Sequence, residues 1–224
     1  MDLSSITNSW DYILNGIRYT LELTVITAIG GLFIGTILAL FRLSTNRYLS
    51  SFARIYVNTI RSIPLVLVLF WFFLLMPEVL QILFQTDHPI AIGADRTAIV
   101  TFILFESAYF SEIMRSGIQT IKKGQIYAAF GLGLTYWQTM RYVILPQATR
   151  NMLPLLLTQT IILFQDTSLV YVINGNDFMG AITKIAQRDG ALVTLYGFAA
   201  VSYLMVSLSL SLLIRRLQMK LTVN

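Results

Sequence analysis

Five apolar segments, each about as long as a lipid bilayer is thick, dominate this sequence. They run roughly from Thr20 to Phe41, Val57 to Met76, Ala98 to Met114, Met152 to Ile173 and Ala191 to Ile214. About 20 apolar residues in a helix cross the hydrocarbon core, where a helix also satisfies its own backbone hydrogen bonds. We therefore predict an all-α integral membrane protein in which five transmembrane helices form a single domain over residues 1–224.

Composition excludes several classes of protein. Of the 224 residues, 56% are hydrophobic and only 12% are charged, which is outside the range of soluble domains. The absence of Cys and the single His88 leave no thiolate ligands, no cysteine nucleophile and no partner for a histidine-based metal site or triad. We expect no catalytic residue, no metal and no cofactor in this chain. Asp2 and Asp11 stand where a cleavable signal peptide would be basic, so insertion is expected to depend on the first span.

When the five segments are taken as spans, most of the basic residues fall on one side of the membrane. The predicted inner side receives Arg42, Arg47, Arg54, Arg61, Arg115, Lys122, Lys123, Arg141, Arg150, Arg215, Arg216 and Lys220. The opposite side receives Arg18, Arg96, Lys184 and Arg188 together with most of the acidic residues. Lys and Arg accumulate in cytoplasmic loops, so the amino terminus is predicted outside and the carboxyl terminus inside. This bias also accounts for the net charge of +5 without a nucleic-acid partner.

The predicted outer segments are too short to form a ligand-capturing domain. Residues Trp10 to Arg18 fit either an interfacial segment or a disordered terminus, and the loop from Pro77 to Pro89 is brief. Capture of a ligand from solution, if it occurs, is therefore expected to belong to another protein.

The long inner loop, about residues 116–150, has the pattern of two short helices. Gly124 and Gly133 bracket the first, and Gly133 is placed to end it in a left-handed conformation. Thr135 and Gln138 have the spacing of a capping box that begins the second helix, which we expect to stop before Pro146. An amphipathic connector lying on the membrane explains such a pattern equally well.

The first short helix carries small and aromatic residues together. Ala128 and Ala129 leave a shallow surface that a partner can approach closely. Tyr127 and Phe130, three positions apart, are predicted to place their rings on one side of the helix.

This loop resembles the EAA coupling loop of ATP-binding cassette importer permeases. That pattern reads Glu-Ala-Ala, three residues, Gly, nine residues, a β-branched residue, any residue, Leu-Pro. The matching positions are Ala128, Ala129, Gly133, Val143, Leu145 and Pro146. Tyr127 stands where the family has Glu, so the resemblance implies aromatic packing in place of a charged contact with the ATPase. The implied coupling residues are Gly124, Tyr127, Ala128, Ala129, Gly133, Leu145 and Pro146.

Further runs resemble the polar amino acid branch of these permeases and cover most of the chain. They are Arg61-Ser62-Ile63-Pro64, Glu106-Ser107-Ala108-Tyr109, Ser111-Glu112-Ile113, Arg115-Ser116-Gly117-Ile118 and Asp166-Thr167-Ser168-Leu169-Val170. The runs around Pro64 and Asp166 look most like glutamate/aspartate import permeases. A permease for glutamine, arginine or histidine remains an alternative.

The resemblance implies a type I importer in a bacterial inner membrane. Its implied partners are membrane lipid, a second permease subunit that is a related but different chain, two ATPase subunits that bind ATP and Mg²⁺, and a periplasmic or surface-tethered amino-acid-binding protein. The sequence has no Gly-x-x-x-x-Gly-Lys-Ser/Thr phosphate loop, so we expect ATP hydrolysis on a partner chain.

Polar residues within the spans are candidates for the translocation path, because ionisable groups in a membrane are costly and usually functional. Glu106 lies in the third span and Asp166 in the fourth. Gln159 is seven residues before Asp166 and so shares its helix face, with Thr160 and Thr167 as a neighbouring stripe. The candidate path residues are Arg61, Glu106, Gln159, Asp166, Thr167 and Ser168. Hydrogen bonding between neighbouring helices is the purely structural alternative.

Two charged residues near the inner boundary admit ordinary explanations as well. Arg61 is either a positive-inside anchor or a guide for an anionic substrate leaving the membrane. Glu112 is three residues before Arg115, and a helical ion pair explains it. A passive channel or secondary transporter would need more spans, a repeat or a broken ion-binding helix, and it would not explain the coupling loop.

Overall fold

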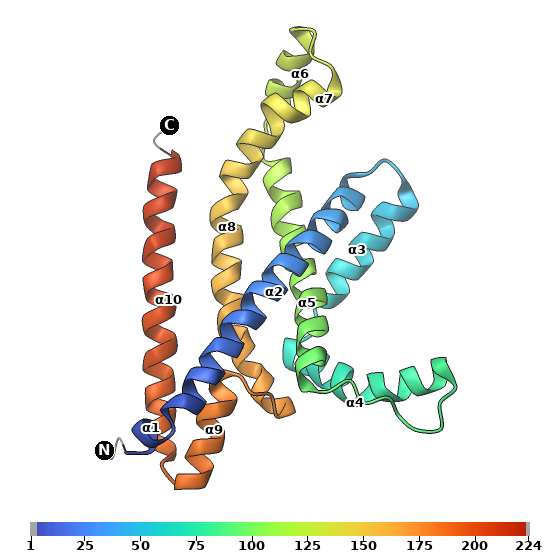
Figure 1. The fold of residues 1–224 in the computed structure, drawn as a ribbon. Helices are drawn as coiled ribbons and strands as arrows, with labels where there is room; N and C mark the ends of the chain where they lie inside the picture. Colours follow the sequence, from blue (N-terminus) through green and yellow to red (C-terminus); the bar gives the residue numbers. More distant parts are fainter. Residues whose placement is uncertain (1–3, 223–224) are drawn as a thin grey trace.

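The chain folds entirely from helices in the part that its computed structural model describes, residues 4–222 (Figure 1). The elements are α1 (Ser4–Asn8), α2 (Trp10–Leu43), α3 (Arg47–Arg61), α4 (Leu65–Phe84), α5 (Ala94–Gln119), α6 (Lys123–Gly131), α7 (Tyr136–Thr139), the π-helical η1 (Met140–Ile144), α8 (Leu145–Asp166), the 3-10 helix η2 (Thr167–Ile173), α9 (Phe178–Asp189) and α10 (Leu192–Thr222). Asp2, the extreme ends of the predicted domain and the side chain of Lys220 lie outside the described residues.

The prediction of five membrane-spanning helices is confirmed. Within residues 4–222, five helical stretches are long and apolar enough to cross a membrane: Trp10–Leu43, Leu65–Phe84, Ala94–Gln119, Tyr136–Ile173 and Leu192–Met219. The first begins earlier than expected, because Trp10 to Arg18 continues α2 as regular helix and forms neither a separate interfacial segment nor a disordered one. Pro77 also lies inside α4, so the predicted loop at Pro77 to Pro89 starts only after Phe84.

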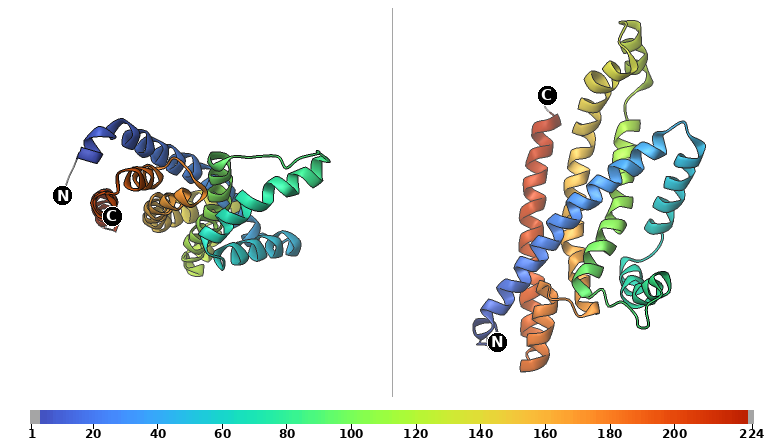
Figure 2. Two further views of the ribbon diagram at one scale, coloured as in Figure 1. Left: turned by 90° about the horizontal axis from the view of Figure 1, so that it is seen from below. Right: turned by 45° about the vertical axis from the view of Figure 1, so that its right-hand side comes forward.

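The second predicted span, Val57 to Met76, is wrong as one continuous helix. The chain breaks at Ser62, Ile63 and Pro64, between α3 and α4. Proline disfavours helical geometry in the residue before it, and Pro64 is itself extended, with ψ at 133°. As a result α3 returns along α2, whereas α4 runs across the direction of α5, α8 and α10 (Figures 1 and 2).

Helix α5 lies at the centre of the bundle and packs most extensively against α2. Gly31 and Gly35 allow this close approach, since an added Cβ on Gly35 would lie 2.9 Å from both the Phe110 Cβ and the Ser107 carbonyl oxygen. Phe102, Phe105 and Leu69 belong to the main apolar core formed around α5. Small residues four apart commonly bring membrane helices together in this way. Packing between α2 and α5 therefore sets the frame that carries the polar residues of α5.

The prediction that the second short helix stops before Pro146 is wrong. Helix α7 continues through the π turns of η1 directly into α8, where Pro146 occupies the first turn. The Leu145 N–H donates to the Met140 carbonyl, five residues earlier, so the wider turn accommodates the proline ring. Fourth-span residues after Asp166 form the tighter η2, and α8 with η2 reaches Ile173 as predicted.

Both ends of the bundle carry short helices. Figure 1 shows α6 and α7 at the end where α10 finishes, and α1 and α9 at the opposite end. The beginning of α2 and the end of α10 thus lie at opposite ends of the bundle, as an odd number of spans requires. Which end faces the cytoplasm remains a prediction from the distribution of basic residues.

Candidate functional site

Helix α6 ends in the turn expected from its glycine. Gly133 has a φ of 81°, the Leu134 N–H donates to the Ala129 carbonyl at 3.1 Å, and the Gly133 N–H donates to the Phe130 carbonyl at 2.9 Å. These two bonds form a Schellman motif, which favours glycine at the left-handed position. Gly124 lies within the first turn of α6 and not before it, because the helix starts at Lys123. The turn at Gly133 sets the direction in which the chain leaves α6.

The capping box of the second short helix is present as predicted. The Gln138 N–H donates to Thr135 Oγ1, and the Thr135 N–H donates to Gln138 Oε1 at 2.8 Å. Beneath the two helices, Ile121, Ile144 and Ala148 are buried together. Ala129 is buried as well, whereas Ala128 is exposed. The loop is therefore a packed helix-turn-helix element.

Aromatic and apolar side chains are exposed along this element and on to the start of α8. They are Tyr127, Phe130, Leu132, Tyr136, Trp137, Tyr142 and Leu145. Trp137 is 78% exposed and Tyr127 is 67% exposed. We call these seven residues the aromatic surface. Exposed apolar patches of this kind usually mark contact with another protein or a membrane.

Two of the candidate path residues meet inside the bundle. The Gln159 side-chain amide donates to Glu106 Oε2 at 3.0 Å, and both side chains are buried. Glu106 Oε1 is buried with no hydrogen-bond partner. An unsatisfied polar atom at this depth is costly, so this pair is either a structural link with an open position or part of the path.

The other fourth-span candidates are arranged differently. Asp166 is half-buried, and its side chain makes no hydrogen bond or ion pair within the described residues. Thr167 is fully buried and bonds locally to the Phe164 carbonyl at 2.7 Å. Ser168 is half-buried in η2. Thr160, on the neighbouring stripe, lines a cavity of about 340 Å³ between α8 and α10 whose other walls are largely apolar.

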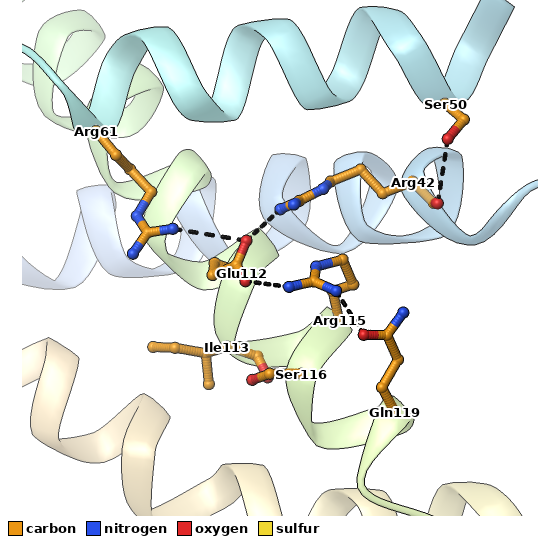
Figure 3. Close-up of polar contacts among 8 residues, drawn as sticks. All are labelled: Arg42, Ser50, Arg61, Glu112, Ile113, Arg115, Ser116 and Gln119. Carbon is orange, nitrogen blue, oxygen red and sulfur yellow. Dashed lines mark hydrogen bonds and ion pairs between the residues drawn. The ribbon is translucent and has the colours of Figure 1, made fainter. Parts of the chain in front are cut away.

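Among the described residues, Arg61 makes no hydrogen bond or ion pair with Glu106 or Gln159, and it belongs instead to a charged cluster toward the C-terminal end of α5 (Figure 3). Glu112 accepts hydrogen bonds from Arg42 and Arg115, and it forms a longer ion pair with Arg61 at 3.5 Å. The Arg61 guanidinium also lies over the Tyr109 ring, 5.3 Å from its centroid. The predicted pairing of Glu112 with Arg115 is confirmed, but it is only one of three ion pairs. Arg42 is 70 residues away in sequence, and no local pattern could reveal its contact.

Sequence reasoning also missed the burial of an acid at the start of α9. Asp177 accepts from the Met179 N–H at 3.0 Å and caps α9, while Thr20 accepts from the Phe178 N–H at 2.9 Å. Burial raises the pKa of Asp177 to about 6. The Asp177-Phe178-Met179 run has a visible N-cap signature, which would have revealed α9. Its burial against α2 has no such local signal.

Comparisons with known proteins agree with this arrangement. Residues 31–223 match the family model of the binding-protein-dependent transport system inner membrane component. The glutamate/aspartate import permease protein GltK of Escherichia coli O6:H1 is 49% identical over 97% of this chain and 96% of that protein. The probable glutamine ABC transporter permease protein GlnP of Bacillus subtilis is 37% identical over 95% of this chain and 93% of that protein.

Solved structures show the same fold. One subunit of an amino acid ABC transporter crystallised with histidines has a TM-score of 0.88 at 28% identity, over 98% of this chain and 99% of that chain. A chain of the inward-facing MetNI methionine ABC transporter has a TM-score of 0.74 at 19% identity, over 96% and 98% of the two chains. The second likeness supports the fold alone.

The family match spans most of the chain and includes the helix-turn-helix element between α5 and α8. Such permeases work with ATPase and binding-protein partners, and the ATPase activity belongs to the partner subunits. This multi-pass membrane chain is therefore a permease subunit of the amino acid ABC transporters, in the family of inner membrane components of binding-protein-dependent transport systems.

Proposed function

We propose that this chain is a permease subunit of an ATP-driven importer for the acidic amino acids glutamate and aspartate, in a bacterial inner membrane. The observation that carries the substrate proposal is the 49% identity to glutamate/aspartate import permeases over nearly the whole of both chains. Glutamine is the second candidate, because glutamine permeases reach 37% identity over similar lengths.

The proposed orientation has the amino terminus outside and the carboxyl terminus inside. It is supported by the bias of Lys and Arg toward the loops at the α6–α7 end. In this orientation the aromatic surface faces the cytoplasm. A partner ATPase would pack against Tyr127 and its exposed neighbours. At the position of Tyr127, the EAA loop of the importer permeases has a Glu.

The proposed mechanism is alternating access without a covalent step. ATP binding closes the ATPase pair and draws the α6–α7 elements of two permease subunits together, and this movement opens the translocation path between the permeases to the outside. ATP hydrolysis then returns the permease pair to the state that is open to the inside. The second permease is proposed to be a related but different chain, since Bacillus subtilis has both GlnP and GlnM among the relatives. Glu106, Gln159, Asp166, Thr167, Ser168 and Arg61 are proposed to line or flank the path.

The proposal is tested by omission in reconstituted vesicles. Vesicles would hold this chain with its cognate second permease and ATPase, and would receive the cognate binding protein and radiolabelled glutamate. Uptake is expected to require both ATP and the binding protein, and excess unlabelled aspartate is expected to compete more strongly than glutamine. Stronger competition by glutamine would show that the importer prefers a neutral amino acid to an acidic one. Flux through this chain alone without ATP would overturn the importer function itself.

A further inference from the structure

The charged cluster around Glu112 contains more positive than negative charge. Three guanidinium groups, those of Arg42, Arg61 and Arg115, contact one carboxylate (Figure 3). The cluster therefore carries a formal charge of +2. Its side chains are partly withdrawn from solvent, and Arg115 Nε is buried without a hydrogen-bond partner. Excess charge held in such surroundings is expensive, and a further anion would relieve the excess.

The three arginines are not held equally. Arg42 Nη1 lies 2.5 Å from Glu112 Oε2, and the Arg42 side chain is only 10% exposed. Arg115 contacts the other carboxylate oxygen from the same helix and also donates to Gln119 Oε1. Arg61 Nη1 reaches the same Oε2 atom as Arg42, but at 3.5 Å, and its side chain is 38% exposed. Arg61 therefore has the weakest hold on Glu112.

Arg61 also stands at the end of its helix, where little of its own helix follows it. It is the last residue of α3, directly before the break at Ser62 to Pro64. Its guanidinium lies over the Tyr109 ring. On α5, Tyr109 is three residues after Glu106 and three residues before Glu112, so it stands between the buried pair and the charged cluster along this helix. If Arg61 turned away from Glu112, Arg42 and Arg115 would still neutralise that carboxylate.

We propose that Arg61 is a releasable carboxylate-binding residue for an acidic amino acid on its way to the inner side, and that Glu112 is its resting counterion. Arg42 and Arg115 are positioning residues, because they hold Glu112 whether or not Arg61 is bound to it. The inference rests on the proposed importer function and adds the residue that handles the substrate's negative charge. A guanidinium suits this exchange, since it can pair with a carboxylate through two parallel hydrogen bonds.

A double-mutant cycle separates substrate binding from a simple tie between helices. Arg61→Gln, Glu112→Gln and the double variant would be reconstituted with the cognate partners, and glutamate uptake and ATP hydrolysis would be measured together. Loss of one charge-assisted contact is expected to reduce uptake by about tenfold or more in Arg61→Gln. The same loss is expected when Arg61→Gln is added to Glu112→Gln, while ATP hydrolysis stimulated by the binding protein persists in both. If the effect of Arg61→Gln disappears in the Glu112→Gln background, Arg61 serves only as a partner of Glu112 and the inference is overturned.

A matched control variant tests whether the loss of glutamate uptake is specific to Arg61. Arg54 is exposed on the same helix as Arg61, and Arg54→Gln is expected to leave uptake unchanged.

The double-mutant cycle would be run in phosphatidylcholine vesicles with and without phosphatidylglycerol. A loss seen only with the anionic lipid would assign Arg61 to lipid phosphate and contradict the proposal. Should Arg61→Gln fail to assemble, Arg61→Lys keeps the charge without the paired geometry and is expected to lower uptake several-fold. Unchanged uptake in Arg61→Lys would then count against the proposal.

The result also distinguishes this inference from the proposed function. A wild-type complex that takes up no amino acid with ATP and binding protein overturns the importer function. An active wild-type complex whose uptake is insensitive to Arg61→Gln overturns the role of Arg61 alone.

Discussion

Gln159 donates a hydrogen bond of 3.0 Å to Glu106 across 53 residues of sequence, inside the apolar bundle. This bond joins α5 to α8, the two helices that flank the helix-turn-helix element. It links the span that carries Tyr109 and Glu112 to the span that carries Asp166. The relative position of these two helices is therefore fixed by a polar contact as well as by apolar packing.

Gln159→Leu is expected to lower the stability of the purified complex by about 1 kcal/mol, because Glu106 loses its buried donor. Adding Glu106→Leu should recover part of that loss, since neither polar group is then left unpaired. Thermal unfolding in detergent measures both effects. Thr158→Val is the control, because Thr158 is exposed and its hydroxyl bonds only to the nearby Pro154 carbonyl. Strictly additive effects of the two leucine substitutions would argue that the contact carries no coupling.

Gly35→Ala tests the close contact between α2 and α5. The added methyl group would meet the Phe110 Cβ and the Ser107 carbonyl oxygen at 2.9 Å, and neither can move without shifting α5. We expect a loss of roughly 1–3 kcal/mol in the same thermal unfolding experiment. Gly197→Ala in α10 meets nothing within 4 Å and should be neutral. A Gly35→Ala variant as stable as Gly197→Ala would show that the two helices lie further apart.

Tyr127→Ala is expected to weaken association of the ATPase subunits by about fivefold or more, because a buried interface aromatic typically contributes over 1 kcal/mol. The affinity can be measured by titrating ATPase against the purified permease pair. Tyr127→Phe should bind almost normally, since the ring is retained. Tyr48→Ala is the control, as Tyr48 is 86% exposed on α3 and lies outside the aromatic surface. Wild-type affinity in Tyr127→Ala would remove Tyr127 from the docking contact.

The raised pKa of Asp177 predicts that the stability of the folded chain depends on pH. Its pKa is raised from 3.8 to about 6 by burial, so the folded chain binds more protons than the unfolded chain between these values. The stabilisation is therefore fully present below pH 3.8 and is lost as the pH rises through about 6. We expect a fall of roughly 1–3 kcal/mol over this window. Asp177→Asn, which can still cap α9, should flatten the thermal-unfolding profile across it. An equally steep profile in Asp177→Asn would assign the titration to another group.

The spans and the short helices α6 and α7 were predictable because their signals are local. Apolar length defines the membrane helices, Gly133 ends α6, and the capping box at Thr135 and Gln138 begins α7. The Gly31-x-x-x-Gly35 spacing also carried a packing signal that sequence reasoning did not use. The break at Pro64 was signalled by the proline itself, but apolar composition on both sides favoured one continuous span.

The contacts within the candidate site could not be predicted, because they join distant positions. Glu112 has a visible partner in Arg115 three residues away, but its contacts with Arg42 and Arg61 depend on how α2 and α3 pack against α5. The shared face of Gln159 and Asp166 was predictable from helix periodicity, whereas the pairing of Gln159 with Glu106 depends on the crossing of α5 and α8. The continuity of α7 with α8 depends on a π turn that has no sequence signature.

The most direct measurement of the central claim is ATP-driven glutamate uptake in vesicles holding the full complex with Gly133→Val, compared with Gly131→Ala. Gly133 has a φ of 81°, and a β-branched residue there strains the turn by about 1–2 kcal/mol, whereas Gly131 lies in α6 with open space around it. If α6 and α7 transmit the movement of the ATPase subunits to the spans, Gly133→Val should lower the ratio of uptake to ATP hydrolysis several-fold. Gly131→Ala should match the wild type. Uptake that is unchanged in Gly133→Val, or that proceeds without ATP, would contradict the account.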